Sequence, residues 1–197
     1  MPKPDAPAGE PGRLSFSPVT QATRADFIEV FAGRGGPKYC WCMLWRAVGA
    51  ELKDTRGPAR EVQMLGRIDR GVPVGLVGYL EGTPVAWVSV APKETFRGLG
   101  GPEPAADETV FSLTCMHMRR SLRGAGRGHE LIDAAIAHAR NAGATVLEAY
   151  PVAPDSPSYR HMGLVPAFAA RGFHEVGKQG TRRHVMRLSL EGGVAEG

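Results

Sequence analysis

The chain is poor in cysteine and in long apolar runs. Its cysteines are Cys40, Cys42 and Cys115, an odd number, and no second pair completes a four-ligand zinc site, so we expect no metal. No apolar stretch near the start resembles a signal peptide, and none reaches the length of a membrane span. We therefore expect a cytoplasmic protein with no membrane partner, because a reducing cytoplasm is the default for such a chain.

Aromatic residues make up only 7% of the 197 residues, and the net charge is a modest +4. The aromatic side chains that interleave with cations in a single-strand nucleic-acid binder are missing. Arginines still gather locally, at Arg119, Arg120, Arg123, Arg127, Arg182 and Arg183. Because a phosphate-bearing small molecule accounts for such clusters as well as a nucleic acid does, we expect no nucleic-acid partner.

What the chain does have is a hydrophobic fraction of 43%, which is enough for a core. Its length suits a single domain, which we place at residues 14–190. Residues 1–13 are rich in proline, glycine and charge, and we expect them to form a flexible tail. Residues 191–197 are expected to form a C-terminal tail. No internal repeat is visible.

Hydrophobic spacing predicts a mixed α/β (α+β) domain, with a β-α-α-β-β half followed by a β-α-β-α-β-β half. In the first half, the elements are expected at Leu14–Val19, Arg24–Phe31, Gly57 to Arg70, Val74–Leu80 and Pro84–Val90. In the second half, they are expected at Val110–Met118, Gly128–Ala142, Thr145–Tyr150, Tyr159–Ala170, Phe173–Val176 and His184–Leu190. The strand that begins at Val110 is apolar on both faces, so it should be central in its sheet.

A glycine-rich turn, Arg123-Gly124-Ala125-Gly126-Arg127-Gly128, joins that strand to the next helix. The first turn of a helix exposes unpaired N–H groups at the positive end of the helix dipole. Glycines let this backbone wrap closely around an anion, and two arginines add full charges, so the pattern predicts a pyrophosphate site. A dinucleotide-binding fingerprint and a plain strand-to-helix turn are the alternatives. A Walker loop is excluded, because no Lys-Ser or Lys-Thr follows the glycines.

Arg123-x-x-Gly126-x-Gly128 is similar to the R/Q-x-x-G-x-G/A signature of the GNAT N-acetyltransferase superfamily. The strand around Glu148 and the Gly172-Phe173 pair resemble two later landmarks of that family. The resemblance implies a GNAT-type mixed, mostly antiparallel central sheet with a splayed pair of parallel strands, flanked by helices. It also implies that acetyl-CoA is the cosubstrate.

For the cofactor, the resemblance implies particular residues. In that family the strand before the loop splays from its neighbour, and freed backbone groups pair with the pantetheine arm; Met116, His117 and Met118 occupy those positions here. The backbone N–H near Met118 would polarise the thioester carbonyl. The pyrophosphate would lie on the loop formed by Arg123, Gly124, Ala125, Gly126, Arg127 and Gly128.

Acetylation of an amine needs a general base that accepts a proton from it. Some GNAT members carry a glutamate for this role on the strand after the cofactor helix, and Glu148 stands there. Pairing with an arginine is the alternative reading of this carboxylate. The usual general acid of the family is a tyrosine, but Phe168 occupies its position. Tyr150 and Tyr159 are the substitutes, His161 is a weaker one, and a reaction without a dedicated acid is a further alternative.

The acceptor is predicted to be a small amine, with an aminoglycoside-like antibiotic as one concrete option. Trp41 and Trp45 belong to a dense group of aromatic and sulfur side chains, which forms either one wall of the acceptor pocket or a small satellite core. Glu148 and Asp155, with the acidic residues of the 103–108 segment, are expected to supply an acidic cleft. A catalytically weak acetyl-CoA sensor and a protein N-acetyltransferase are alternatives, and the sequence leaves a homodimer open.

Overall fold

The computed structural model describes residues 12–123 and 126–191. Within these ranges, seven strands form one sheet in the order β1-β2-β3-β4-β5-β7-β6. The pair β4 and β5 is parallel, and each other neighbouring pair is antiparallel. The architecture confirms the expected mixed, mostly antiparallel sheet with one parallel pair.

The order of elements also agrees with the sequence-based prediction. The first half contains β1 (Ser15–Pro18), α1 (Arg24–Ala32), η1 (Gly49–Lys53), α2 (Gly57–Asp69), β2 (Leu76–Leu80), β3 (Thr83–Pro92) and η2 (Lys93–Thr95). The second half contains β4 (Val110–Met118), η3 (Arg120–Leu122), α3 (Gly128–Asn141), β5 (Val146–Ala149), η4 (Arg160–Met162), α4 (Val165–Ala169), β6 (His174–Gln179) and β7 (Arg183–Ser189). The helix expected over Tyr159–Ala170 is divided into η4 and α4, because Gly163 takes a φ of +93° that favours glycine.

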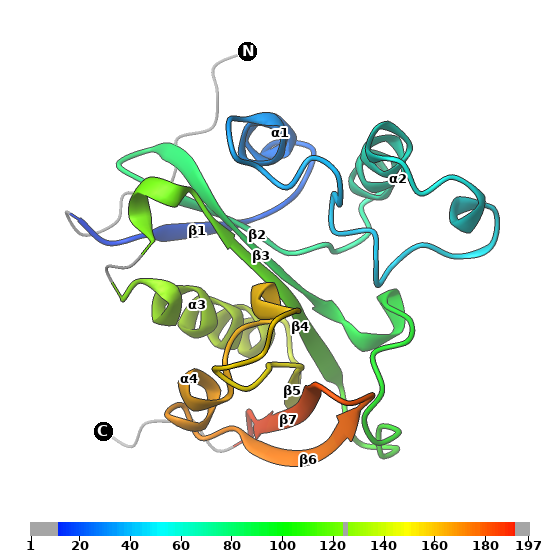
Figure 1. The fold of residues 1–197 in the computed structure, drawn as a ribbon, viewed down its shortest axis with the longest axis vertical. Helices are drawn as coiled ribbons and strands as arrows, with labels where there is room; N and C mark the ends of the chain where they lie inside the picture. Colours follow the sequence, from blue (N-terminus) through cyan, green and yellow to red (C-terminus); the bar gives the residue numbers. More distant parts are fainter. Residues whose placement is uncertain (1–11, 124–125, 192–197) are drawn as a thin grey trace.

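Helices cover both faces of the sheet (Figure 1). On one face, α3 and α4 lie over a core to which Leu131 and Ala135 of α3 and Leu113 of β4 belong. On the other face, α1 and α2 cover an aromatic core, where Phe31 meets Trp87 with 5.6 Å between their ring centroids. The apolar stripes of the helices thus bury both faces of β3 and β4, the two central strands that border the site.

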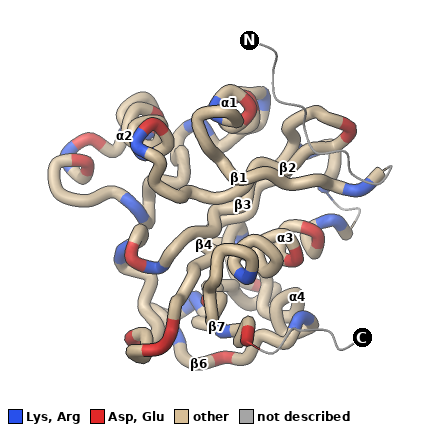
Figure 2. The backbone as a smooth tube through the Cα atoms, turned by 180° about the vertical axis from the view of Figure 1, so that it is seen from behind, with Lys and Arg blue, Asp and Glu red and all other residues tan. Residues whose placement is uncertain are grey.

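Charged side chains are mixed on the helices. Seen from behind, each of α1, α2 and α3 carries both basic (Lys or Arg) and acidic (Asp or Glu) residues (Figure 2). None of the helices in the described ranges is both long enough and apolar enough to cross a membrane. The helices therefore present mixed charge to their surroundings.

Strand β4 leaves its parallel neighbour halfway along its length. It pairs with β3 from Phe111 to Met118, but it pairs with β5 only from Val110 to Leu113. In the described part of the chain, Cys115 to Met118 therefore have no strand partner on the β5 side. The backbone groups along this edge are free to pair with another extended molecule.

A β-bulge marks the point where the two strands separate. Ser89 of β3 pairs with Cys115, and the next residue, Val90, pairs with Leu113, so Thr114 is an extra residue on β4. The extra residue interrupts the inward–outward alternation of the strand. As a result, the neighbours Thr114 and Cys115 both face the side of the sheet that α1 and α2 cover, where Thr114 reaches the Ser89 side chain.

Candidate active site

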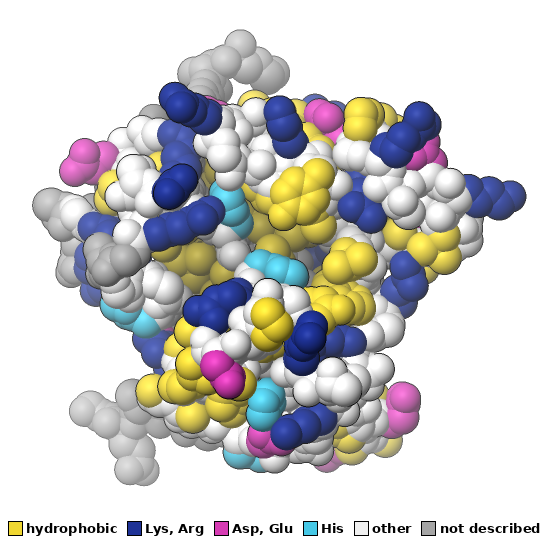
Figure 3. Space-filling view, in the orientation of Figure 1, with side chains coloured by type: hydrophobic (Ala, Val, Ile, Leu, Met, Phe, Trp, Pro, Cys, Tyr) yellow, Lys and Arg dark blue, Asp and Glu magenta, His cyan; other side chains and the backbone are white. Residues whose placement is uncertain are grey.

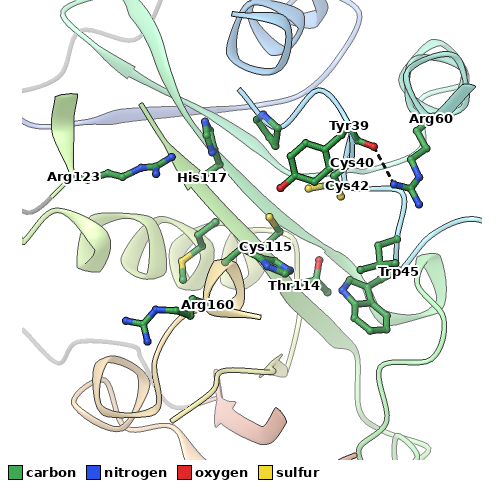
Figure 4. Close-up of a pocket in the computed structure, with 14 residues that line it drawn as sticks. Tyr39, Cys40, Cys42, Trp45, Arg60, Thr114, Cys115, His117, Arg123 and Arg160 are labelled. Carbon is green, nitrogen blue, oxygen red and sulfur yellow. Dashed lines mark hydrogen bonds between the residues drawn. The ribbon is translucent and has the colours of Figure 1, made fainter. Parts of the chain in front are cut away.

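A cavity of about 530 Å³ lies beside the free edge of β4. Its walls come from the segment 37–45, from α2, from the second half of β4 with its following turn, and from η4 (Figure 4). The space-filling view shows a hollow at this place, with histidine and apolar side chains inside it and Lys and Arg side chains around it (Figure 3). The separation of β4 from β5 thus opens a pocket rather than a filled seam.

One end of the cavity adjoins the predicted cofactor residues. Met116, His117 and Arg123 line it, and the carbonyl of Met118 accepts a hydrogen bond from Arg123 Nε at 2.8 Å. Met118 itself is buried. The bond fixes the arginine beside the free strand edge, so a cation and unpaired backbone groups face the same space.

The glycine turn leads from this end to α3. Gly124 and Ala125 lie outside the described residues, so their predicted contact with a pyrophosphate stays a prediction. Gly126 has a φ of +73°, which favours glycine, and Gly128 begins α3. A Cβ added at either of these two glycines would meet no atom within 4 Å. The open space in front of the helix N-terminus is what an anion would need.

Arg127, the second arginine of the turn, points toward its own helix. Its Nη1 lies 3.6 Å from a carboxylate oxygen of Glu130, and another oxygen of Glu130 accepts a hydrogen bond from the N–H of Leu14 at 2.9 Å. The charge of Arg127 is therefore partly balanced, whereas Arg123 faces the cavity without a carboxylate partner in the described ranges.

The opposite wall is the sulfur-rich segment around Trp41. Trp41 and Cys42 take left-handed φ values of +45° and +50°, which are unusual for side chains of this size. This backbone turns Trp41 into the aromatic core, where its ring stacks on Phe31 at 5.0 Å. The structure therefore places Trp41 in the satellite core and not in the cavity wall, contrary to its expected contact with the acceptor.

The thiols of Cys40, Cys42 and Cys115 all line the cavity (Figure 4). Trp87 Nε1 donates a hydrogen bond to Cys42 Sγ at 3.0 Å. The hydrogen bond between Cys40 and Cys42 and burial raise the pKa of the Cys40 thiol, and a hydrogen bond with Cys115 and burial raise that of Cys42. The two thiols are thus neutral, and in the described ranges no group of three side chains is arranged to hold a metal ion.

Trp45, the other tryptophan of the segment, does line the cavity. The Arg183 guanidinium lies 4.3 Å from the centre of the Trp45 ring. The centres of the Tyr159 and Trp45 rings are 6.3 Å apart. Tyr159 is half-buried and has a φ of +59° at the start of η4. It supports Trp45 but is not part of the cavity wall, so its expected role as an acid stays a prediction.

Glu148 lies away from the cavity, fully buried between β4 and β7. Its carboxylate forms ion pairs with Lys93 at 2.8 Å and Arg187 at 2.7 Å, and it accepts a hydrogen bond from the Tyr150 hydroxyl at 2.5 Å. The alternative reading of this carboxylate, a pairing with arginine, is thus what the structure shows. A carboxylate with no exposed surface and three strong partners is poorly placed to act as a general base for an acceptor in the cavity.

The predicted acids share that burial. Tyr150 is completely buried, and burial and the neighbouring carboxylate of Glu148 raise the pKa of its phenol. Its hydroxyl also lies 2.9 Å from Ser112 Oγ. Phe168 packs edge-on against Phe173, with 5.1 Å between ring centroids, so this position offers an apolar ring where the family has a hydroxyl.

The expected acidic cleft does not form. Asp155 is exposed in a turn outside the cavity wall, and Glu108 pairs with Arg187 at 3.1 Å. No aspartate or glutamate of the described ranges lines the cavity. The charged side chains that do line it are arginines, namely Arg60, Arg123 and Arg160.

Two histidines line the cavity beside these arginines. Burial and the charge of Arg123 lower the pKa of His117 to about 4. Burial lowers the pKa of His161 from its usual value near 6.5. Both imidazoles are therefore neutral at pH 7 and able to accept a proton.

Sequence reasoning did not single out Arg60, Thr114 and Arg160, which also line the cavity. Arg60 Nη1 donates to the carbonyl of Tyr39 at 3.0 Å, and Arg160 Nη1 donates to that of Pro154 at 2.5 Å. An arginine on an amphipathic helix and a threonine in a strand are common, so neither attracts notice. The only available signal was a hydroxyl in the middle of a largely apolar strand, and Ser112 shares that signal.

Comparison with known proteins agrees with this geometry. The model of the Acetyltransferase (GNAT) family matches residues 41–173, which is more than half of the chain. The protein belongs to the GNAT acetyltransferase family. A search of curated proteins found no match.

Solved structures show the same fold at low sequence identity. An N-acetyltransferase from Staphylococcus aureus Mu50 is 12% identical with a TM-score of 0.54, covering 91% of this chain and all of that one. A ribosomal-protein-S5-alanine acetyltransferase from Vibrio fischeri is 10% identical with a TM-score of 0.56, covering 93% and 97%. A Salmonella typhimurium protein described as a candidate acetyltransferase, solved with its cofactor acetyl-CoA, is 17% identical with a TM-score of 0.52, covering 94% and 99%.

Proposed function

We propose that the protein transfers an acetyl group from acetyl-CoA to the primary amine of a small molecule, with both bound together in the cavity beside β4. One observation carries this proposal. The free edge of β4 runs from the cavity to a glycine turn at the N-terminus of α3, so a strand edge, a cation and a helix N-terminus follow one another. A molecule with an extended amide arm and a pyrophosphate matches that series.

The residues present fit the cosubstrate. The edge at Met116, His117 and Met118 would hold the pantetheine arm, and Arg123, Gly126 and Gly128 would hold the pyrophosphate. Bound there, acetyl-CoA supplies an acyl group activated as a thioester. The likeness to a structure solved with acetyl-CoA supports this assignment.

His161 is the proposed base. It is neutral at pH 7 and lines the cavity, so its imidazole is free to accept the proton that the amine must lose. His117 is a poorer choice because its pKa of about 4 makes it a weak base. Glu148 keeps its place in the family pattern, but its burial supports a structural role.

The charges of the cavity bear on the acceptor. Three arginines and no carboxylate line it among the described residues, so a polycationic aminoglycoside would find no partner for its charges. An amine that also carries an anionic group fits better, with Arg60 at the end of the cavity away from Arg123 (Figure 4). A cytoplasmic location and a homodimer rest on the sequence alone and stay predictions.

Calorimetry with acetyl-CoA tests the cofactor assignment. Arg123→Gln should weaken binding by about tenfold, since it removes one charge-assisted contact. Arg120→Gln is the matched control, because Arg120 is exposed three residues earlier and does not line the cavity. Equal affinity for both variants would contradict the assignment of Arg123.

An amine panel with release of free thiol tests the reaction. Amino acids and related anionic amines should be better acceptors than aminoglycosides. His161→Gln should lower the rate by about 10²–10⁴-fold, while His174→Gln, on an exposed position of β6, should not. Tight binding of acetyl-CoA with no thiol released by any amine would favour the sensor alternative instead.

A further inference from the structure

The structure holds a buried cation that no described carboxylate neutralises. Arg46 is 1% exposed, and its Nη2 donates to the carbonyl of Val74 at 2.8 Å and to Ser89 Oγ at 3.0 Å. Its guanidinium lies 3.9 Å from the centre of the Phe96 ring. All these partners are neutral. Burial lowers the pKa of Arg46 to about 9, so it is still charged at neutral pH.

A short hydrogen-bond chain connects this cation to the cavity. Ser89 Oγ lies 2.9 Å from Thr114 Oγ1, and Thr114 is the bulge residue of β4 that lines the cavity wall. Arg46 also interacts electrostatically with Cys42 and Cys115, two thiols of that wall. The field of the arginine therefore extends into the cavity.

The arginine sets the direction of the chain. A guanidinium only donates, so Ser89 accepts from Arg46. Ser89 is completely buried, and within the described residues Thr114 Oγ1 is the acceptor in reach of its own hydroxyl proton. If Thr114 donated instead, the Ser89 proton would be buried without an acceptor, which is costly. With Ser89 donating, the proton of Thr114 remains available to the cavity.

Acetyl transfer needs a donor of this kind. One C–N bond forms and one C–S bond breaks, the bonding pair leaves on sulfur, and the proton of the amine passes to the base. The leaving thiolate takes a proton from water after release. Phe168 offers no hydroxyl at the family's usual place, so negative charge on sulfur has no partner there.

We propose that the Thr114 hydroxyl is the catalytic hydrogen-bond donor to the leaving thiolate, and that Ser89 and Arg46 are positioning residues that aim and polarise it. This inference rests on the proposed function. It assigns the role of the family's tyrosine to a residue on the opposite side of β4 from Phe168, which belongs to the core under α3 and α4.

The test is the pKa of the thiol of bound CoA. The thiolate of CoA absorbs in the ultraviolet. Subtracting the absorbance of the complex with desulfo-CoA removes the contribution of the protein's own thiols. Thr114→Val, which keeps the shape and loses the hydroxyl, should raise this pKa by about one unit, a tenfold loss of thiolate stabilisation. Thr114→Ser should restore the wild-type value. Ser89→Ala and Arg46→Met should shift it in the same direction as Thr114→Val.

Ser112→Ala is the matched control. Ser112 is an equally buried hydroxyl on β4, but it bonds to Tyr150 and lies outside the cavity wall, so its loss should leave the pKa of bound CoA unchanged. The cavity arginines Arg60, Arg123 and Arg160 are the same in each variant. A difference between Thr114→Val and Ser112→Ala therefore reports the donor itself.

Kinetics give a second readout. With a competent amine, Thr114→Val should lower kcat by about tenfold and leave KM for acetyl-CoA unchanged, since the donor acts on charge that develops in the reaction. If wild-type protein fails to bind CoA, the proposed function is overturned together with this inference. If CoA binds normally and Thr114→Val leaves both its thiol pKa and kcat unchanged, the inference alone is overturned.

Discussion

Glu148 and Arg46 are both buried charges close to β4, and they differ in their partners. Glu148 has two cations and a phenol within 2.8 Å. Arg46 has a carbonyl, a serine hydroxyl and an aromatic face. The first charge is neutralised where it lies, so it joins β5, β7 and the 93–108 segment into one unit. The second is not, so its field remains available to the cavity.

The comparison shows why burial alone is a poor guide to a catalytic role. The position of Glu148 in the family pattern indicated a catalytic base, whereas no family pattern indicated a role for Arg46. Removing one partner of a buried ion pair leaves an uncompensated charge, whereas removing a buried charge whose partners are all neutral leaves only their hydrogen bonds unmade. The loss of Glu148 should therefore destabilise the fold more than the loss of Arg46.

Glu148→Ala should show the largest effect. It leaves Lys93 without its carboxylate partner and Arg187 with Glu108 alone, so we expect the free energy of unfolding to fall by about 3–5 kcal/mol. Urea denaturation measures this loss. Glu175→Ala is the control, because its pair with His184 at 2.6 Å is exposed to solvent and should contribute little to stability. Full stability with a large loss of activity would instead support Glu148 as the base.

Gly101→Ala should disturb the same network from the covering loop. An added Cβ would lie 2.9 Å from both carboxylate oxygens of Glu148, at a φ of +88°. Gly98 also has a positive φ, +64°, but a Cβ there would meet nothing within 4 Å. We expect Gly98→Ala to cost about 1–2 kcal/mol from the backbone alone, and Gly101→Ala to cost about 1–3 kcal/mol more from crowding. Equal denaturation midpoints for Gly98→Ala and Gly101→Ala would show that the loop shifts to accept the added Cβ at no measurable cost.

Acidification should add a further cation to the cavity. The folded pKa of His117, about 4, lies below its usual 6.5. The unfolded chain therefore binds more protons between these values, and stability should fall as the pH falls from 6.5 to 4. Denaturation at pH 7 and pH 5 measures the loss, which His117→Gln should reduce. The exposed His174 is the control. If the unfolding free energy of His117→Gln falls with pH as steeply as that of the wild type, His117 is not the cause of the loss.

Arg46→Met should have a smaller effect on stability than Glu148→Ala. The methionine removes the charge but leaves the buried Val74 carbonyl and Ser89 hydroxyl without this donor, so we expect the free energy of unfolding to fall by about 1–3 kcal/mol. The same denaturation series measures it. A loss as large as that of Glu148→Ala would mean that Arg46 is a structural charge after all, and the contrast between the two residues would disappear.

Much of the fold follows from local patterns. The apolar run Val110–Met118 predicted the bounds of β4 correctly, and the spacing of Leu131 and Ala135 predicted the buried face of α3. The glycine turn was predicted from glycines that lie between a strand and the N-terminus of the next helix. Each of these features depends on residues close together in sequence.

The site was less predictable because it depends on distant contacts. The partners of Glu148 come from residues 55 and 39 positions away, Lys93 and Arg187, and no local signal brings them together. Two left-handed residues turned Trp41 into the core while Trp45 stayed in the cavity, although both stand in one aromatic segment. The bulge at Thr114 appears only when β3 is paired with β4.

The bulge at Thr114 also changes the face on which the odd-numbered residues of β4 lie. On one side of it, odd-numbered residues such as Leu113 point toward α3; on the other side, odd-numbered residues such as Cys115 and His117 stand opposite Ser89 and Trp87 and share their face. Deleting the single residue Thr114 would restore one unbroken parity along β4. Cys115 and His117 would keep their face, because they already stand opposite Ser89 and Trp87. The extra residue thus adds a hydroxyl to the face that carries the thiol and the imidazole.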